Sequence, residues 1–299
     1  MPALSLKIDP VQRIALQAVD AAARAARADW FVAGATARDW LLQDIHGIET
    51  LRATKDVDFG IAVRDWDAFR RIRETISAGG EFAQDPRADH RLNHRRVAGF
   101  HIDLVPFGPL AGADGEIAWP PDRSIVMNVT GFDEAFDAAV QVAIDEGFVV
   151  RVASLPGLML MKLFAWRDRR HEAMHKDAWD LRLLLTQYER AGNADRIFDE
   201  GAMKAEGFDA ACAAARLLGR DVAGLLRPRS RAALLSLLDA ELNDPDSSEL
   251  VEQLAHASAA GRPTQGDLDG GLRVAEVLKY FIKHPDFGHD TMGQTDFFR

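Results

Sequence analysis

This chain of 299 residues contains a single cysteine, Cys212. One thiol excludes a disulfide or a cysteine zinc site within one chain. The sequence also lacks an uncharged apolar run approaching the ~20 residues that span a bilayer. Its first residues, Met-Pro-Ala-Leu-Ser-Leu-Lys, contain no apolar signal-peptide core. We therefore expect a cytoplasmic protein with no membrane partner.

Basic residues are outnumbered by acidic ones, 36 to 46, which leaves a formal net charge of −10. This balance argues against a broad electrostatic surface for nucleic acid, but it leaves room for a local basic patch. The hydrophobic share of 47% and the charged share of 27% are typical of a globular protein. The length predicts two domains, or one domain with a large appendage.

Acidic and apolar side chains alternate in Asp56-Val57-Asp58-Phe59. Successive side chains of a strand point to opposite faces, so both carboxylates lie on one face and both apolar residues face a core. Neighbouring carboxylates repel each other, and a hard divalent cation, Mg²⁺ first, relieves that repulsion. The simpler alternative is an exposed strand edge with two solvated aspartates.

An apolar segment, Trp30–Ala33, runs into Gly34-Ala35-Thr36 and then into residues of helical character. A strand, a turn of small residues and a helix N-terminus together present backbone N–H groups to a phosphate. Gly34 and Ala35 would let a triphosphate approach the backbone, and Thr36 would donate from its hydroxyl. An ordinary strand-to-helix turn is the alternative.

Asp103 is the one acid in the apolar strand predicted for residues 101–107, where His101 and Asp103 face the same side. A buried carboxylate is costly without a partner. A cation shared with Asp56 and Asp58 would supply that partner. Three carboxylates on adjacent strands can hold two divalent ions, which together stabilise an in-line displacement.

These three segments resemble the nucleotidyltransferase fold of the polymerase-beta type, whose pattern is Gly-Gly or Gly-Ser, then Asp-x-Asp, then a third Asp on a later strand. The resemblance implies that Asp56 and Asp58 hold metals, Mg²⁺ or Mn²⁺, and that Asp103 is the third ligand and the candidate base. It implies an α/β (α+β) fold, with a mixed sheet flanked by helices and a helical C-terminal domain. The implied reaction moves a nucleoside monophosphate from an NTP to an acceptor hydroxyl.

Two later segments narrow the choice among families of this fold: Leu155–Lys162 and His175–Leu181. They are similar to the AbiEii/AbiGii toxins, which have a helix with a functional Lys and then a Lys/Arg-Asp-x-x-Asp-Leu helix. The resemblance implies that Lys162 and Asp177 are catalytic residues, with Lys162 also clamping the triphosphate, and that the partner is an antitoxin. The alternatives are a lysine that snorkels to solvent and a purely structural salt bridge of Asp177. In either role of Lys162, we expect Lys162→Met to fold at least as stably as the wild type.

The segment from Gly34 to Leu42 also resembles the Gly-Gly-x-Val-Arg-Asp-x-Leu-Leu motif of CCA-adding enzymes and bacterial poly(A) polymerases. This resemblance completes the predicted nucleotide-binding set, which is Gly34, Ala35, Thr36, Arg38 and Lys162. The downstream Arg-Arg-Asp-Phe-Thr-Ile-Asn motif of those enzymes does not occur, because Arg95-Arg96 is followed by Val-Ala-Gly. The toxin-like branch is favoured. A tRNA nucleotidyltransferase acting on an RNA end and a non-catalytic partner-binding module with a degenerate site remain alternatives.

We predict a nucleotidyltransferase core over residues 1–153 and a helical domain over residues 154–299, of which residues 154–190 complete the active site. Helical periodicity predicts helices over residues 65–77, 210–219, 230–243, 248–259 and 272–282. Asp9 and Pro10 predict the start of a helix, residues 81–107 predict a strand pair, and Asp145-Glu146-Gly147 predicts a hairpin turn. A cluster of arginines in the C-terminal part is either an acceptor-binding patch or a solvated helix face. Its members are Arg216, Arg220, Arg227, Arg229 and Arg231.

Overall fold

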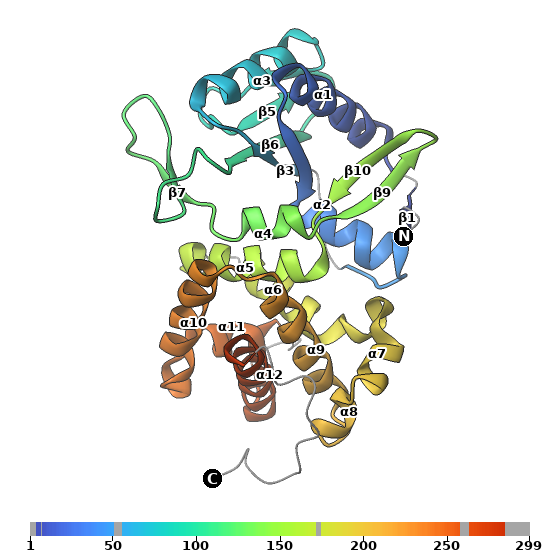
Figure 1. Cartoon of the computed structure of the whole chain (residues 1–299), viewed down its shortest axis with the longest axis vertical. Helices are drawn as coiled ribbons and strands as arrows, with labels where there is room; N and C mark the ends of the chain where they lie inside the picture. The colour runs from blue at the N-terminus through green and yellow to red at the C-terminus, as the bar shows by residue number, and fades with distance from the viewer. Residues whose placement is uncertain (1–3, 7, 51–55, 172–174, 258–262, 285–299) are drawn as a thin grey trace. The chain divides into compact units, whose positions relative to one another are not determined.

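The computed structural model describes residues 4–6, 8–50, 56–171, 175–257 and 263–284. The chain forms two compact units, Met1–Met161 and Lys162–Arg299. The boundary falls inside helix α5 (Leu155–Arg169). The first unit is a mixed sheet flanked by helices and the second is helical (Figure 1), so the predicted fold class is confirmed.

The main sheet of the first unit has eight strands among the described residues, in the order β1-β9-β10-β2-β3-β6-β5-β4. They are β1 (Leu4–Ser5), β2 (Asp29–Ala33), β3 (Asp56–Ala62), β4 (Phe82–Gln84), β5 (Arg91–His94), β6 (His101–Phe107), β9 (Val140–Asp145) and β10 (Phe148–Val152). β3 and β6 are parallel, whereas β2 with β3 and β5 with β6 are antiparallel. A separate antiparallel pair joins β7 (Glu116–Ala118) to β8 (Val126–Asn128).

Strand β3 shows the predicted alternation of buried and accessible side chains. Val57 and Phe59 are completely buried, whereas Asp56 and Asp58 keep partial exposure. Because neighbouring side chains of a strand point to opposite faces, both carboxylates share the face turned away from Val57 and Phe59. The prediction from the alternating pattern is confirmed.

Two helices of the first unit pack against each other, α1 (Pro10–Ala26) and α3 (Trp66–Ala78) (Figure 1). The N-terminus of α1 is capped as its sequence predicts, because Asp9 accepts a hydrogen bond from the Val11 N–H at 2.8 Å and Pro10 opens the helix. Helix α1 also contacts β2 and β3.

The carboxylate-bearing face of the sheet also packs aromatic rings against α4 (Phe132–Asp137). The Phe31 ring lies 5.6 Å from that of Phe107 and 5.8 Å from that of Phe136, centroid to centroid. Gly60 is opposite Phe31 in the register of β2 and β3. A Cβ atom at Gly60 would lie 2.1 Å from the Phe31 ring, so the missing side chain lets that ring lie over β3.

The second unit is built from helices that follow α5. They are α6 (Lys176–Gln187), α7 (Ala194–Asp199), α8 (Ala202–Ala205), α9 (Ala210–Leu225), α10 (Pro228–Leu242), α11 (Glu249–His256) and α12 (Gln265–Lys283). Helices α9 and α12 approach closely at Gly219, where a Cβ atom would lie 3.1 Å from the Leu278 carbonyl oxygen. The four helices predicted after residue 202 are confirmed with shifted ends, although residues 258–259 of the third lie outside the described residues. Helix α7 was not predicted, and α8 was not predicted as a separate helix.

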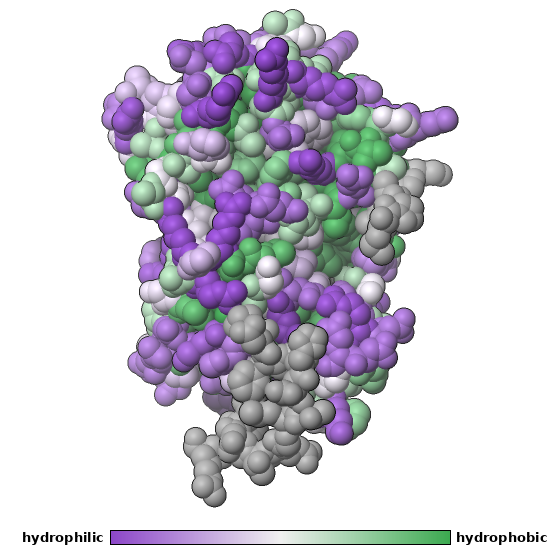
Figure 2. All heavy atoms as spheres, in the orientation of Figure 1, coloured by the Kyte–Doolittle hydropathy of each residue, from purple (hydrophilic) through white to green (hydrophobic). Residues whose placement is uncertain are grey.

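Hydrophilic residues predominate on the face in Figure 2, with smaller hydrophobic areas among them. Within the described ranges, none of the helices is both long enough and apolar enough to cross a membrane.

We expect Gly60→Ala to lower the free energy of unfolding by roughly 1–3 kcal/mol, because the added methyl group overpacks against the buried Phe31 ring. Urea denaturation followed by tryptophan fluorescence measures this loss. Phe31→Leu provides the matched background, because the smaller side chain makes room for the methyl group. The double variant should lose less than the sum of the single losses. Additive losses would show that the two side chains do not clash.

Candidate active site

The pairing of β3 with its neighbours arranges the acidic side chains in rows across the sheet. Asp58 lies opposite Asp103, and Asp56 lies opposite His101, in the parallel register of β3 and β6. Paired residues of adjacent strands point to the same face. The structure therefore brings the three predicted aspartates onto one face, together with a histidine that was not in the predicted set.

Asp103 is buried, and its carboxylate is held by Arg91. The Arg91 Nε donates to Oδ1 and Nη2 donates to Oδ2, both at 2.8 Å. Arg91 lies opposite Asp103 in the antiparallel register of β5 and β6. The hydrogen bond to Asp103 raises the pKa of Arg91 above its ordinary value. The sequence predicted a cation as the partner of this carboxylate, and in the structure a guanidinium already fills part of that role.

Asp56, His101 and Asp103 form a group that could hold a metal ion, because their ligand atoms all lie within 4.8 Å of one another. The His101 Nε2 is 3.7 Å from Asp56 Oδ2 and 3.8 Å from Asp103 Oδ2. This nitrogen is buried and has no hydrogen-bond partner among the described residues. Two carboxylate oxygens and one imidazole nitrogen are a donor set that fits a divalent cation. The signal for His101 was its spacing, since His101-x-Asp103 repeats the Asp56-x-Asp58 pattern on the neighbouring strand.

Asp58 lies against the turn that follows β2 rather than in that group. Its register partner is Ala33, the last residue of β2. Gly34 has a φ of 63°, and a Cβ atom there would lie 1.8 Å from Asp58 Oδ2. The position thus requires glycine twice over, for the left-handed backbone and for the close approach of the carboxylate.

Helix α2 (Gly34–Asp39) starts at this turn and continues as a π-helical turn, Trp40–Ile45. The N-cap residue is Ala33, whose side chain accepts no hydrogen bond from the first N–H groups of the helix. Thr36 was predicted to donate its hydroxyl to a phosphate. In the structure that hydroxyl is buried and donates to the Asp56 carbonyl oxygen at 2.7 Å, which ties the turn to β3.

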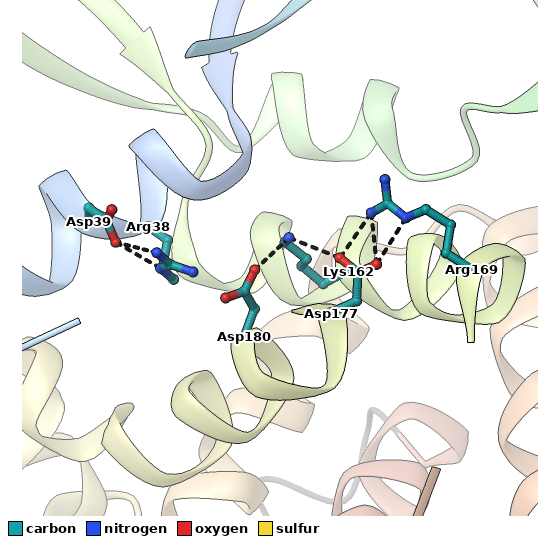
Figure 3. Close-up of polar contacts among 6 residues, drawn as sticks. All are labelled: Arg38, Asp39, Lys162, Arg169, Asp177 and Asp180. Carbon is teal, nitrogen blue, oxygen red and sulfur yellow. Dashed lines mark hydrogen bonds and ion pairs between the residues drawn. The ribbon is translucent and has the colours of Figure 1, made fainter. Parts of the chain in front are cut away.

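Arg38 was also predicted to bind the nucleotide. Its side chain is only 3% exposed and donates to Asp39 Oδ1, from Nε at 2.8 Å and from Nη2 at 2.6 Å (Figure 3). In this conformation the guanidinium belongs to an ion pair inside the first unit.

In the second unit, Lys162 of α5 lies between two carboxylates of α6 (Figure 3). Its Nζ is 3.0 Å from Asp177 Oδ1 and 2.5 Å from Asp180 Oδ2. Arg169 also donates to both oxygens of Asp177. Asp177 and Asp180 are three residues apart and therefore share one side of α6. The alternative in which Lys162 reaches into solvent is wrong, because its side chain is 15% exposed and its charge is taken up by buried carboxylates.

The charges of this cluster depend on one another. Burial lowers the pKa of Lys162, but the attraction of Asp180 and Asp177 outweighs burial and raises the pKa above its ordinary value. Burial raises the pKa of Asp177, but Lys162 and Arg169 outweigh it and hold the pKa below its ordinary value. Lys162 and Asp177 are therefore charged at neutral pH, and each depends on its oppositely charged neighbours.

Three of the clustered C-terminal arginines are used within the second unit. Arg216 donates to Glu206 at 3.0 Å, and its guanidinium lies 4.2 Å from the centre of the Phe281 ring. Arg220 pairs with Glu200 at 3.0 Å. Arg231 donates to the carbonyl oxygens of Ile282 and Ala223. Internal ion pairs and helix contacts thus account for most of this cluster.

We expect Lys162→Met to lower the free energy of unfolding by about 3–5 kcal/mol, because it leaves two buried carboxylates without their shared cation. The sequence alone had predicted the opposite, that Lys162→Met folds at least as stably as the wild type. Chemical denaturation followed by tryptophan fluorescence measures the loss.

Lys279→Met is the matched control for that substitution. Lys279 pairs with Asp239 at 2.8 Å, but the Asp239 side chain is 52% exposed. Solvent can replace this lysine, so the control should lose less than about 1 kcal/mol. Equal losses in the two variants would show that the buried carboxylates do not depend on Lys162.

Residues 15–271 match a family described as nucleotidyl transferase AbiEii toxin, type IV toxin–antitoxin system. None of the curated proteins matches the chain. Among solved structures, the chain is similar to the solution structure of the antibiotic-resistance factor ANT(2'')-Ia. The two are 16% identical, the match covers 67% of this chain and 98% of that chain, and the TM-score is 0.35. The family match spans most of the chain and includes both acidic strands and the Lys162 helix. The chain therefore belongs to the AbiEii nucleotidyl transferase toxin family of type IV toxin–antitoxin systems and is a nucleotidyltransferase.

Proposed function

We propose that this enzyme transfers a nucleoside monophosphate from an NTP to an acceptor hydroxyl, with the help of divalent cations. One observation supports this reaction most directly. Ala33, Asp58, Asp103 and Arg91 are successive register partners on β2, β3, β6 and β5, so they form one row across the sheet. The turn whose N–H groups suit a phosphate thus lies beside the carboxylates that suit the accompanying cations.

Divalent cations held here would offset the negative charge that the triphosphate carries during transfer. Asp56, Asp58 and Asp103 are the proposed ligands. Gly34 and Ala35 are proposed to let the phosphates approach the backbone, and Thr36 serves the same end by holding the turn on β3.

Arg91 orients the Asp103 carboxylate through its two hydrogen bonds. If Asp103 also acts as the base, as the polymerase-beta pattern implies, the acceptor hydroxyl would donate to a carboxylate lone pair that Arg91 does not use. Its proton would pass to that oxygen while the acceptor oxygen bonds to the α-phosphorus and pyrophosphate leaves.

Lys162 and Asp177 remain in the proposed functional set because the AbiEii pattern includes them. The structure adds a condition to the role of Lys162. Asp177 and Asp180 use two of the three N–H donors of its ammonium group, so a triphosphate oxygen would accept from the third. Arg169 also donates to Asp177 and so reduces the share of the Lys162 charge that this carboxylate needs.

The proposed substrates are an NTP and an RNA or tRNA end, the proposed partner is an antitoxin, and the proposed compartment is the cytoplasm. Incubating the full chain with Mg²⁺ or Mn²⁺, each labelled NTP and purified tRNA tests the reaction. Labelled product that depends on the cation is the expected result. Ordered addition of C, C and A would instead support the CCA-adding alternative, and failure with all four NTPs and with total RNA would support the non-catalytic one.

We expect Asp58→Asn to reduce the transfer rate by a factor on the order of 10² or more, because it removes a charge that offsets the cations. The amide has nearly the shape of the carboxylate, so its packing against Gly34 should persist and the thermal midpoint should change little. Asp29→Asn on β2 is the control, since Asp29 is exposed and lies 3.9 Å from Arg151. An active Asp58→Asn enzyme would remove Asp58 from the proposed ligand set.

Gly34→Ala should raise KM for the NTP and lower kcat together. The new Cβ atom collides with Asp58, so it disturbs both the phosphate turn and the carboxylate row. Gly147→Ala separates this collision from backbone strain, because Gly147 has a φ of 80° with nothing within 4 Å of the added atom. Steady-state kinetics of both variants provide the comparison. If the two variants lose activity equally, the contact between Gly34 and Asp58 is not what matters.

A further inference from the structure

We propose that His101 is a metal ligand, and that it makes the site formed by Asp56, His101 and Asp103 prefer a first-row transition cation such as Mn²⁺ over Mg²⁺. The inference rests on the proposed function, because it concerns the cation that supports transfer. It adds a nitrogen donor to a site for which the sequence predicted carboxylates alone.

The position of the ring nitrogen carries the inference. His101 Nε2 lies between the two carboxylates, 3.7 Å from Asp56 Oδ2 and 3.8 Å from Asp103 Oδ2. Both separations are longer than a hydrogen bond. They suit atoms that share one metal ion, because ligand atoms about 2.0–2.2 Å from a common cation are themselves some 3 Å or more apart.

A comparison with His94 on the neighbouring strand shows what is particular to His101. His94 accepts hydrogen bonds at Nδ1 from the backbone N–H groups of Arg96 and Val97, and its ring packs against Phe82. In the described part of the chain, Nε2 of both histidines is buried without a hydrogen-bond partner. His94 Nε2 lies near one carboxylate, 3.7 Å from Glu81 Oε2, whereas His101 Nε2 lies near two. Buried polar atoms are nearly always satisfied, so a missing partner needs an explanation.

The chemistry of the donor set determines which cation the site prefers. Mg²⁺ favours oxygen ligands and keeps several of its waters, whereas imidazole nitrogen suits transition cations. Mn²⁺ accepts both carboxylate oxygen and imidazole nitrogen. Loss of the imidazole should therefore weaken Mn²⁺ binding and leave Mg²⁺ binding nearly unchanged.

Arg91 supports this site from the far side of Asp103. Its two hydrogen bonds fix the carboxylate, and the ligating geometry of a carboxylate depends on such contacts. The His90 Nε2 is also near, 4.0 Å from Asp103 Oδ2, but His90 is not a member of the group of close ligand atoms. His90 thus offers a control of the same residue type beside the same carboxylate.

Metal binding by the purified, metal-free full chain tests the proposal without any measurement of activity. Free Mn²⁺ is followed by electron paramagnetic resonance during titration, and Mg²⁺ affinity is obtained by competition. His101→Asn should weaken Mn²⁺ binding about tenfold or more, while Mg²⁺ affinity changes by less than about threefold. His90→Asn should bind both cations like the wild type.

A pulsed measurement on the Mn²⁺-loaded wild type detects a coordinated imidazole directly, through modulation by the ¹⁴N nucleus. Its presence in the wild type and in His90→Asn, with loss in His101→Asn, is the expected result. Its absence in the wild type would overturn the proposal, even if His101→Asn fails to fold. If the wild type transfers nucleotide with Mg²⁺ but shows no ¹⁴N signal, the proposal for His101 is wrong and the proposed function stands. A ¹⁴N signal in a protein that transfers no nucleotide would instead disprove the proposed function.

Discussion

The repulsion between carboxylates on one face of two parallel strands is the constraint on which the first unit depends. The β3–β6 register forces Asp58 next to Asp103 and places His101 next to Asp56. Such a row is stable only if positive charge lies beside it. Arg91 supplies part of that charge from β5, and the group of Asp56, His101 and Asp103 has room for a cation. The β2–β3 register brings the Gly34 turn against Asp58, so the turn proposed to bind phosphate lies beside a carboxylate proposed to bind a cation.

In the second unit a buried positive charge, that of Lys162, needs negative partners. Residues 155–166 of helix α5 are apolar except for Lys162, and a lysine in such a segment must either reach solvent or find buried acceptors. Asp177 and Asp180 provide those acceptors from one side of α6, and Arg169 adds a second cation. The Lys and Asp-x-x-Asp elements of the AbiEii pattern therefore form one electrostatic unit. Their joint presence in the sequence is explained by stability as well as by any role in transfer, and the two causes have to be separated by experiment.

Several sequence predictions hold because they depend on local chemistry. Three of them follow from backbone geometry over a few residues. They are the alternation in β3, the Asp9 cap of α1, and the glycine-containing turn between Asp145 and Phe148. The structure gives Thr36 and Lys162 partners that were not predicted, and it divides residues 81–107 differently. The Thr36 hydroxyl has a backbone acceptor on β3, Lys162 has two carboxylates on another helix, and the segment predicted as a strand pair contains three strands. Each difference involves a partner that is distant along the chain.

The sequence by itself determined the fold class, the family and the face on which the aspartates lie, because periodicity and motif spacing are local properties. Only the tertiary structure decided which side chains meet. Arg91 reaches Asp103 because β5 pairs antiparallel with β6, and His101 joins Asp56 because β6 runs parallel to β3 in one particular register. A shift of that register by one residue would turn His101 away from Asp56. Register is set by the packing of the whole sheet, so no local pattern could have paired His101 with Asp56 or Arg91 with Asp103.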